Sequence, residues 1–242
     1  MSFFNAVTEQ FQLVLLYKQI LWEGFLLTIE LGVFSLVVAV ILGILAALGS
    51  FSQSRFIRGT VAAYTTIIRG IPDIVLIFLF YFGMQTLLNK ITESMGVSQI
   101  NISPFVAGVA TIGFMFGAFM AESFRGALLS VPKGQRESAL ALGMSPARVS
   151  FKIVIPQAVR FALPGLNNNW LVLLKATALI SLIGLPDFVS IALKGGQSVR
   201  APFTFLITVA IGYLVLTSVS IVVVKWLEKR FSKGVSTGAY YE

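Results

Sequence analysis

Five stretches of the chain are apolar, and each is long enough to cross a lipid bilayer as a helix. Spanning the hydrocarbon requires about 20 apolar residues in helical form. The predicted spans are residues 25–48, 60–88, 104–124, 161–184 and 203–224. We therefore expect an all-α membrane protein with five transmembrane helices, forming one domain over residues 1–242 and surrounded by membrane lipid.

The composition agrees with a protein that lives in lipid. The chain is 57% hydrophobic and only 12% charged, whereas soluble domains carry about 25% charged residues. Cysteine and histidine are both absent, which excludes disulfides and removes the commonest catalytic base and metal ligand. Most hydrolytic and redox chemistry is thereby excluded, and we expect no catalytic residue, metal site or cofactor in this chain.

The second predicted span is longer than a bilayer requires and carries a break signal. The stretch 69–73 reads Arg-Gly-Ile-Pro-Asp, and an internal proline removes a backbone hydrogen bond and clashes with the preceding turn. We expect a kinked or locally broken helix there.

The basic residues are divided unequally between the two faces of the membrane. Twelve lie in one set of loops, and these are Arg55, Arg58, Arg125, Lys133, Arg136, Arg148, Lys152, Arg160, Lys225, Lys229, Arg230 and Lys233. The opposite face receives Lys18, Lys90, Lys194 and Arg200. Because cytoplasmic loops are rich in Lys and Arg, the N-terminus is predicted outside and the C-terminus in the cytoplasm. This distribution also accounts for the net charge of +8 without nucleic-acid binding.

A polar segment, residues 134–156, joins the third and fourth spans. Residues 135–142 are good helix formers that end at Gly143, and Ser145 followed by Pro146 starts a second short helix expected to reach Pro156. The two helices should expose a small apolar face of Ala139, Leu142, Gly143 and Met144 with a polar rim of Arg136 and Glu137. Such a face requires a partner; the alternative is a solvated connector with no special role.

This segment resembles the coupling loop of ABC importer permeases, whose pattern is Glu-Ala-Ala, three residues, Gly, nine residues, Ile, one residue, Leu-Pro. The matching residues are Glu137, Ala139, Gly143, Ile153 and Pro156. Ser138 replaces the first alanine and Ile155 the leucine. Further stretches, at 68–72, 121–126, 130–134 and 174–179, narrow the resemblance to polar amino acid permeases. The stretches at 69–73, 92–100 and 166–170 resemble the Q-type subunit of histidine/lysine/arginine/ornithine importers.

The resemblance implies a type I ABC importer permease fold in a bacterial inner membrane. It implies two permease chains as a homo- or heterodimer, two cytoplasmic ATPases that bind ATP and magnesium, and a periplasmic or extracellular amino acid binding protein. ATPase coupling would then fall to Arg136, Glu137, Ser138, Ala139, Leu142, Gly143 and Met144. Within this family, the alternative to a basic amino acid is another polar amino acid or an opine.

Five charged residues fall inside predicted spans, and four of them are candidates for contact with substrate: Arg69, Asp73, Glu122 and Lys175. The fifth, Glu30, lies in the outer third of the first span, where it can extend to the interface or form a pair, so a structural role is favoured. A charge at the bilayer centre costs roughly 2.5–3.5 kcal/mol on insertion scales and needs a partner or a wet cavity. The alternative is structural, with Asp73 paired to Arg69 on one helical face and Glu122 paired to Lys175.

Two functions of other classes compete with the importer subunit. A secondary transporter or channel would work without an ATPase, and it leaves the polar segment 134–156 unexplained. A membrane-embedded enzyme needs clustered nucleophiles or metal ligands, and a chain without His or Cys offers only isolated carboxylates and hydroxyls.

Overall fold

The structure, a computed structural model, describes residues 12–231. In this part of the chain the elements are helical throughout. They are α2 (Lys18–Ser50), α3 (Arg55–Gly70), α4 (Asp73–Ser94), α5 (Pro104–Leu129), α6 (Lys133–Ala141), α7 (Pro146–Val149), the π-helical η1 (Ser150–Val154), α8 (Ile155–Ala176), the 3₁₀-helical η2 (Thr177–Ile183), α9 (Phe188–Ser198) and α10 (Pro202–Phe231).

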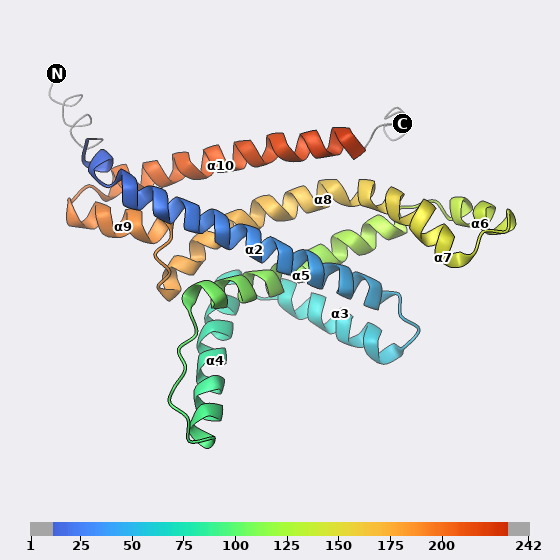
Figure 1. The fold of residues 1–242 in the computed structure, drawn as a ribbon, viewed down its shortest axis with the longest axis horizontal. Coiled ribbons are helices and arrows are strands. Elements are labelled where there is room, and N and C mark those ends of the chain that lie inside the picture. Colours follow the sequence, from blue (N-terminus) through green and yellow to red (C-terminus); the bar gives the residue numbers. More distant parts are fainter. Residues whose placement is uncertain (1–11, 232–242) are drawn as a thin grey trace.

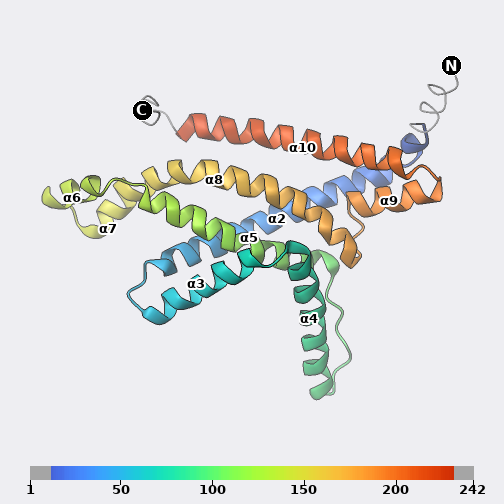
Figure 2. The same cartoon turned by 180° about the vertical axis from the view of Figure 1, so that it is seen from behind.

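Five helices of the described region are long and apolar enough to cross a membrane, as the sequence predicts. They are α2, α4, α5, the continuous stretch Pro146–Ile183, and α10. In Figures 1 and 2, helices α2, α5, α8 and α10 extend along the long axis of the molecule, and α4 leaves them at a steep angle. Helices α6 and α7 lie at one end, and α9 lies at the other (Figure 1).

The predicted break in the second span is confirmed. Helix α3 ends at Gly70, Ile71 is extended at φ −106° and ψ 137°, and α4 begins at Asp73 directly after Pro72. The predicted span 60–88 is therefore divided between two helices that point in different directions (Figure 1).

The second short helix, which starts at Pro146, was expected to end at Pro156, and this prediction is wrong. Helix α7 continues through the π-helical turn Ser150–Val154 into α8, so Pro156 lies in the first turn of α8 and the helix does not stop. A π-helical turn adds a residue to the turn ahead of the proline and relaxes the i→i−4 pattern that the ring would otherwise disrupt. The segment 134–156 is thus joined without a helix end to the fourth span.

Small residues let α5 lie against its neighbours. A Cβ atom placed on Gly113 would lie 2.5 Å from Cγ1 of Val38 on α2, and one on Gly117 would lie 2.7 Å from the hydroxyl of Tyr64 on α3. Close approach at glycine pairs is typical of membrane helices. The same helix buries Ile112 and Phe116 almost completely, so α5 is the centre of the bundle.

Candidate functional site

The turn between α6 and α7 is fixed by a specific set of backbone hydrogen bonds. The N–H of Met144 donates to the carbonyl of Ala139 at 3.1 Å, and the N–H of Gly143 donates to that of Leu140 at 2.9 Å. Gly143 has φ +80°, and these features together form the Schellman motif, which ends a helix with a left-handed residue. The helix end predicted at Gly143 is therefore confirmed, and its direction is set by backbone geometry.

Large apolar side chains beside this turn are exposed. Leu142 is 84% exposed, and Phe151, which follows in the π-helical turn, is 72% exposed. Ala139 differs from expectation, because its side chain is only 4% exposed. Since α6 folds back on the π-helical segment, Ala139 lies inside the helix–turn–helix and does not contribute to its outer face.

The polar side chains of the loop remain in solvent. Arg136, Glu137 and Ser138 are all exposed on α6, and so are the further basic residues Lys133, Arg148 and Lys152. The loop therefore presents an apolar tip surrounded by mostly positive charge, a combination that suits a negatively charged or mixed protein surface.

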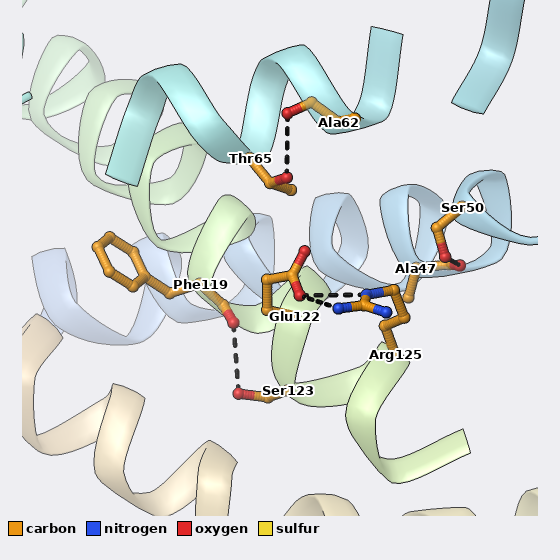
Figure 3. Close-up of polar contacts among 8 residues, drawn as sticks. All are labelled: Ala47, Ser50, Ala62, Thr65, Phe119, Glu122, Ser123 and Arg125. Atoms are coloured by element: carbon orange, nitrogen blue, oxygen red, sulfur yellow. Dashed lines mark hydrogen bonds and ion pairs between the residues drawn. The ribbon is translucent and has the colours of Figure 1, made fainter. Parts of the chain in front are cut away.

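Glu122 and Arg125 form an ion pair on α5. Oε2 of Glu122 lies 2.7 Å from one terminal nitrogen of Arg125 and 3.1 Å from its Nε. Figure 3 shows both side chains in the space between α5 and the helices α2 and α3. They line a cavity of about 350 Å³ together with Arg58, Thr65 and Ser50.

Lys175 does not belong to this group. It lies in the last turn of α8, its side chain is exposed, and no ion pair joins it to Glu122 in residues 12–231. The predicted Glu122–Lys175 pair is therefore wrong, because Arg125, one turn from Glu122 on the same helix, supplies the counter-charge.

Arg69 and Asp73 are not paired with each other. The guanidinium carbon of Arg69 lies 5.7 Å from the ring centroid of Phe119, one turn from Glu122 on α5. No Arg69–Asp73 ion pair occurs in the described chain, because the break at Ile71 removes the common helical face on which that pair depended. The structure thus brings Arg69, near the end of α3, to Phe119 on the same helix as Glu122, and leaves Asp73 at the start of α4.

Arg58 and Arg125 are site residues that the sequence interpretation did not select. Arg58 donates to the carbonyls of Ser52 at 2.7 Å and Gln53 at 3.0 Å, so it ties the loop after α2 to α3. Arg125 was assigned to a cytoplasmic loop. Its i,i+3 spacing from Glu122 was a usable signal, because residues at that spacing are neighbours on a helix.

The asparagine run in the fourth span contributes to helix packing. Asn169 is buried on α8, and its side-chain amide donates to the hydroxyl of Ser123 on α5 at 3.0 Å. Polar contacts of this kind hold membrane helices together. This contact fixes α8 against the helix that carries Glu122.

These features define a polytopic membrane protein with a polar cavity between its helices and an exposed helix–turn–helix loop at one end. The family described as "Binding-protein-dependent transport system inner membrane component" matches residues 39–233, and the chain belongs to this family. It is the permease subunit of an ABC importer in the inner membrane, a non-catalytic component that works with an ATPase and a binding protein.

Individual relatives extend over nearly the whole chain. The histidine/lysine/arginine/ornithine transport system permease protein HisQ of Escherichia coli K12 is 47% identical over 219 residues, which is 90% of this chain and 96% of that protein. The octopine transport system permease protein OccQ of Rhizobium radiobacter is 39% identical over 202 residues, 83% of this chain and 85% of that protein.

The fold agrees with solved importers. The crystal structure of an amino acid ABC transporter with histidines superposes with a TM-score of 0.78 at 29% identity, covering 90% of this chain and 96% of that one. The MetNI methionine ABC transporter in an inward-facing conformation gives a TM-score of 0.63 at 20% identity, covering 91% and 98% of the two chains. At that identity the second likeness concerns the fold alone.

Proposed function

We propose that this chain forms the translocation path of an ATP-driven importer for basic amino acids of the histidine, arginine, lysine and ornithine class. The observation that carries the proposal is the 47% identity to a permease named for those substrates, extending over 90% of the chain. An opine is the second candidate, supported by the 39% identity to the octopine permease.

The loop 134–156 is proposed as the site where the ATPase docks. An exposed Leu142 and Phe151, held on a rigid turn and joined without interruption to α8, can transmit a movement of the ATPase into the fourth span. Arg136, Glu137, Ser138, Gly143 and Met144 would form the polar and backbone parts of the contact, and Ala139 would support it from inside. ATP and magnesium would bind to the partner ATPase.

The assembly is proposed to hold two permease chains, two ATPases and one binding protein outside the membrane. The exposure of helix α4 is an argument for a second permease chain. The buried residues of this apolar helix are only Leu76, Ile77 and Thr92. Its exposed side chains include the apolar residues Val75, Leu79, Phe82 and Leu87. The excess of basic residues near α6 and the end of α10 supports a cytoplasmic C-terminus and an external N-terminus.

Within the path, Glu122 is proposed to meet the positive side chain of the substrate. The carboxylate lies beside a cavity and is held by Arg125, so an incoming guanidinium or ammonium group would compete with that arginine for the same oxygens. Arg69 and Asp73, at the break between α3 and α4, and Lys175, at the end of α8, are proposed to contact substrate in other conformations of the transport cycle.

Reconstitution into vesicles tests this function. The chain would be co-expressed with the permease, ATPase and binding protein of its own operon, and uptake of labelled arginine would be measured with and without ATP inside. We expect ATP-dependent uptake that unlabelled lysine, histidine and ornithine reduce. Competition by octopine alone would favour the opine function, and uptake by the chain without the ATPase would contradict the proposal.

A further inference from the structure

A buried polar cluster lies at the end of the molecule opposite α6, where α9 meets α2 and α10 (Figure 1). It consists of the carboxyl group of Asp187 and the hydroxyl groups of Thr28 on α2, Thr177 on η2 and Tyr213 on α10. Asp187 and Thr177 are fully buried, and Thr28 is 1% exposed. None of these residues belongs to the path or to the loop described above.

The two oxygens of Asp187 differ. Oδ1 accepts from the backbone N–H of Ser190 at 2.9 Å, which is the ordinary cap of a helix N-terminus. Oδ2 is buried and has no hydrogen-bond partner. Burying an ionised oxygen without a donor is expensive, and the cap therefore does not account for the whole side chain.

The proton of Thr28 is already committed. Its hydroxyl donates to the carbonyl of Gly24 at 2.9 Å and accepts from the N–H of Phe188, the first residue of α9, at 3.2 Å. A hydroxyl has one proton. Thr28 has no second proton to offer to Asp187.

The protons of Thr177 and Tyr213 are committed as well. Thr177 donates to the carbonyl of Leu174 at 2.6 Å, so in its 3.2 Å contact with Tyr213 the tyrosine must be the donor. The oxygen of Tyr213 keeps the capacity to accept a hydrogen bond. No hydroxyl group of the cluster therefore donates to Oδ2, which agrees with the lack of a hydrogen-bond partner for this buried oxygen.

We infer that Asp187 is a proton-binding site whose neutral carboxyl group latches α9 onto α2 and α10, and that loss of this proton loosens α9. The neutral carboxyl group brings no charge into this buried site, so it permits the close packing of α9 against α2 and α10. Ionised Oδ2 would remain buried without a partner. The inference does not depend on the substrate, and if the proposed orientation holds, α9 responds to the pH outside the cell.

The surroundings support titration near neutral pH. Burial raises the pKa of Asp187 to about 6. Hydrogen bonds from backbone N–H groups act in the opposite direction and lower this pKa, but the effect of burial is larger. The charged residues nearest in sequence to the cluster, Glu30 on α2, Lys175 before η2 and Lys194 on α9, are exposed. None of them forms an ion pair with Asp187 in the described chain, so no counter-charge stabilises the ionised form.

The direction of the effect follows from the raised pKa. When α9 opens, Asp187 returns toward its ordinary pKa of 3.8, so the open form loses its proton at lower pH than the latched form. The latch is strongest in acid and weakens as the pH rises through about 6. Linkage predicts that the opening equilibrium of α9 increases about tenfold between pH 5 and pH 7.

Hydrogen exchange of α9 in the detergent-solubilised complex tests the latch, with rates corrected for intrinsic exchange at each pH. We expect opening of residues 190–196 to be about tenfold more frequent at pH 7 than at pH 5. The variant Asp187→Asn keeps an oxygen for the cap and replaces Oδ2 by a permanent N–H donor. It should show protection independent of pH, close to that of the wild type at pH 5.

A second variant and a spectroscopic signal complete the test. Tyr213→Phe retains the ring and leaves the carboxyl group of Asp187 in place, so the pH dependence of α9 opening should remain. Infrared spectra at pH 5 should contain a buried carboxylic acid band that Asp187→Asn abolishes. Corrected exchange in the wild type that is equal at both pH values, or absence of that band, would overturn the inference.

Discussion

A Cβ atom added to Gly43 would lie 2.5 Å from the Cβ of Met120, so α2 and α5 meet at this position as closely as their backbones permit. The Cβ of Met120 cannot rotate away, and the backbone nitrogen of Ala121 lies 3.2 Å from the same point. The pair therefore fixes the distance between two helices that carry the centre of the bundle.

Substituting Gly43→Ala should lower the stability of the protein, because the new methyl group would force α2 and α5 apart. Overpacking of this kind costs typically 1–3 kcal/mol. The matched control is Gly59→Ala on α3, where nothing lies within 4 Å of the added atom and alanine favours the helix. Thermal unfolding in detergent should separate the two variants, and equal melting temperatures would contradict the close contact.

Gly143→Ala should weaken the coupling turn by about 1 kcal/mol, since a non-glycine residue is disfavoured at positive φ. There is room for the methyl group, so the cost is conformational. ATP-dependent uptake should fall while membrane insertion stays normal. Gly134→Ala, in the regular part of α6 and equally uncrowded, is the control that should retain uptake.

Glu137→Lys should impair coupling to the ATPase without harming the fold, because Glu137 is exposed on α6 among basic residues. The change removes the acidic member of the rim and adds a positive charge. The comparison of ATPase activity with substrate uptake in proteoliposomes measures the effect. Uptake equal to that of the wild type would argue against a role for the α6 surface in docking.

Glu122→Gln should reduce arginine uptake more than Lys175→Gln does, because Glu122 holds Arg125 at 2.7 Å whereas Lys175 is exposed. Loss of the carboxylate leaves Arg125 beside Arg58 in the same cavity without a counter-charge. Initial rates of labelled arginine uptake provide the comparison. A stronger uptake defect in Lys175→Gln would indicate that the substrate is recognised by Lys175 on the fourth span and not by Glu122.

Asp73→Asn tests whether the start of α4 recognises charge. If Asp73 meets a cationic substrate, the variant should weaken uptake of arginine more than uptake of an uncharged amino acid such as glutamine. The ratio of the two uptake rates is the readout, and an unchanged ratio would assign Asp73 a structural role.

The spans and the break between α3 and α4 could be predicted because they depend on local properties. Bilayer thickness sets the length of an apolar helix, and the Gly-Ile-Pro stretch before Asp73 is incompatible with a continuous helix. The steep departure of α4 could not be predicted in this way, since its direction depends on the backbone at Ile71.

The polar contacts were predicted less well, for two different reasons. The partner of Glu122 is Arg125 on the same helix, and no sequence pattern excluded the pairing with Lys175. The cluster around Asp187 joins α2, η2 and α10 through residues distant in the sequence, so no local signal marked it. Of the predicted apolar face, Leu142 and Gly143 are exposed, whereas Met144 is half-buried and Ala139 is buried. The burial of these two depends on how the loop folds, which the sequence pattern does not reveal.

The central claim is that the tip of the loop 134–156 contacts the ATPase, and a single cysteine tests it most directly. The chain contains no cysteine, so Leu142→Cys, at a side chain that is 84% exposed, introduces a unique thiol. With a photoactivatable thiol reagent we predict a crosslink to the ATPase in native membranes, and none from Val97→Cys near the end of α4. Absence of the Leu142 crosslink, or labelling of Leu142→Cys from outside intact cells by an impermeant reagent, would contradict the account.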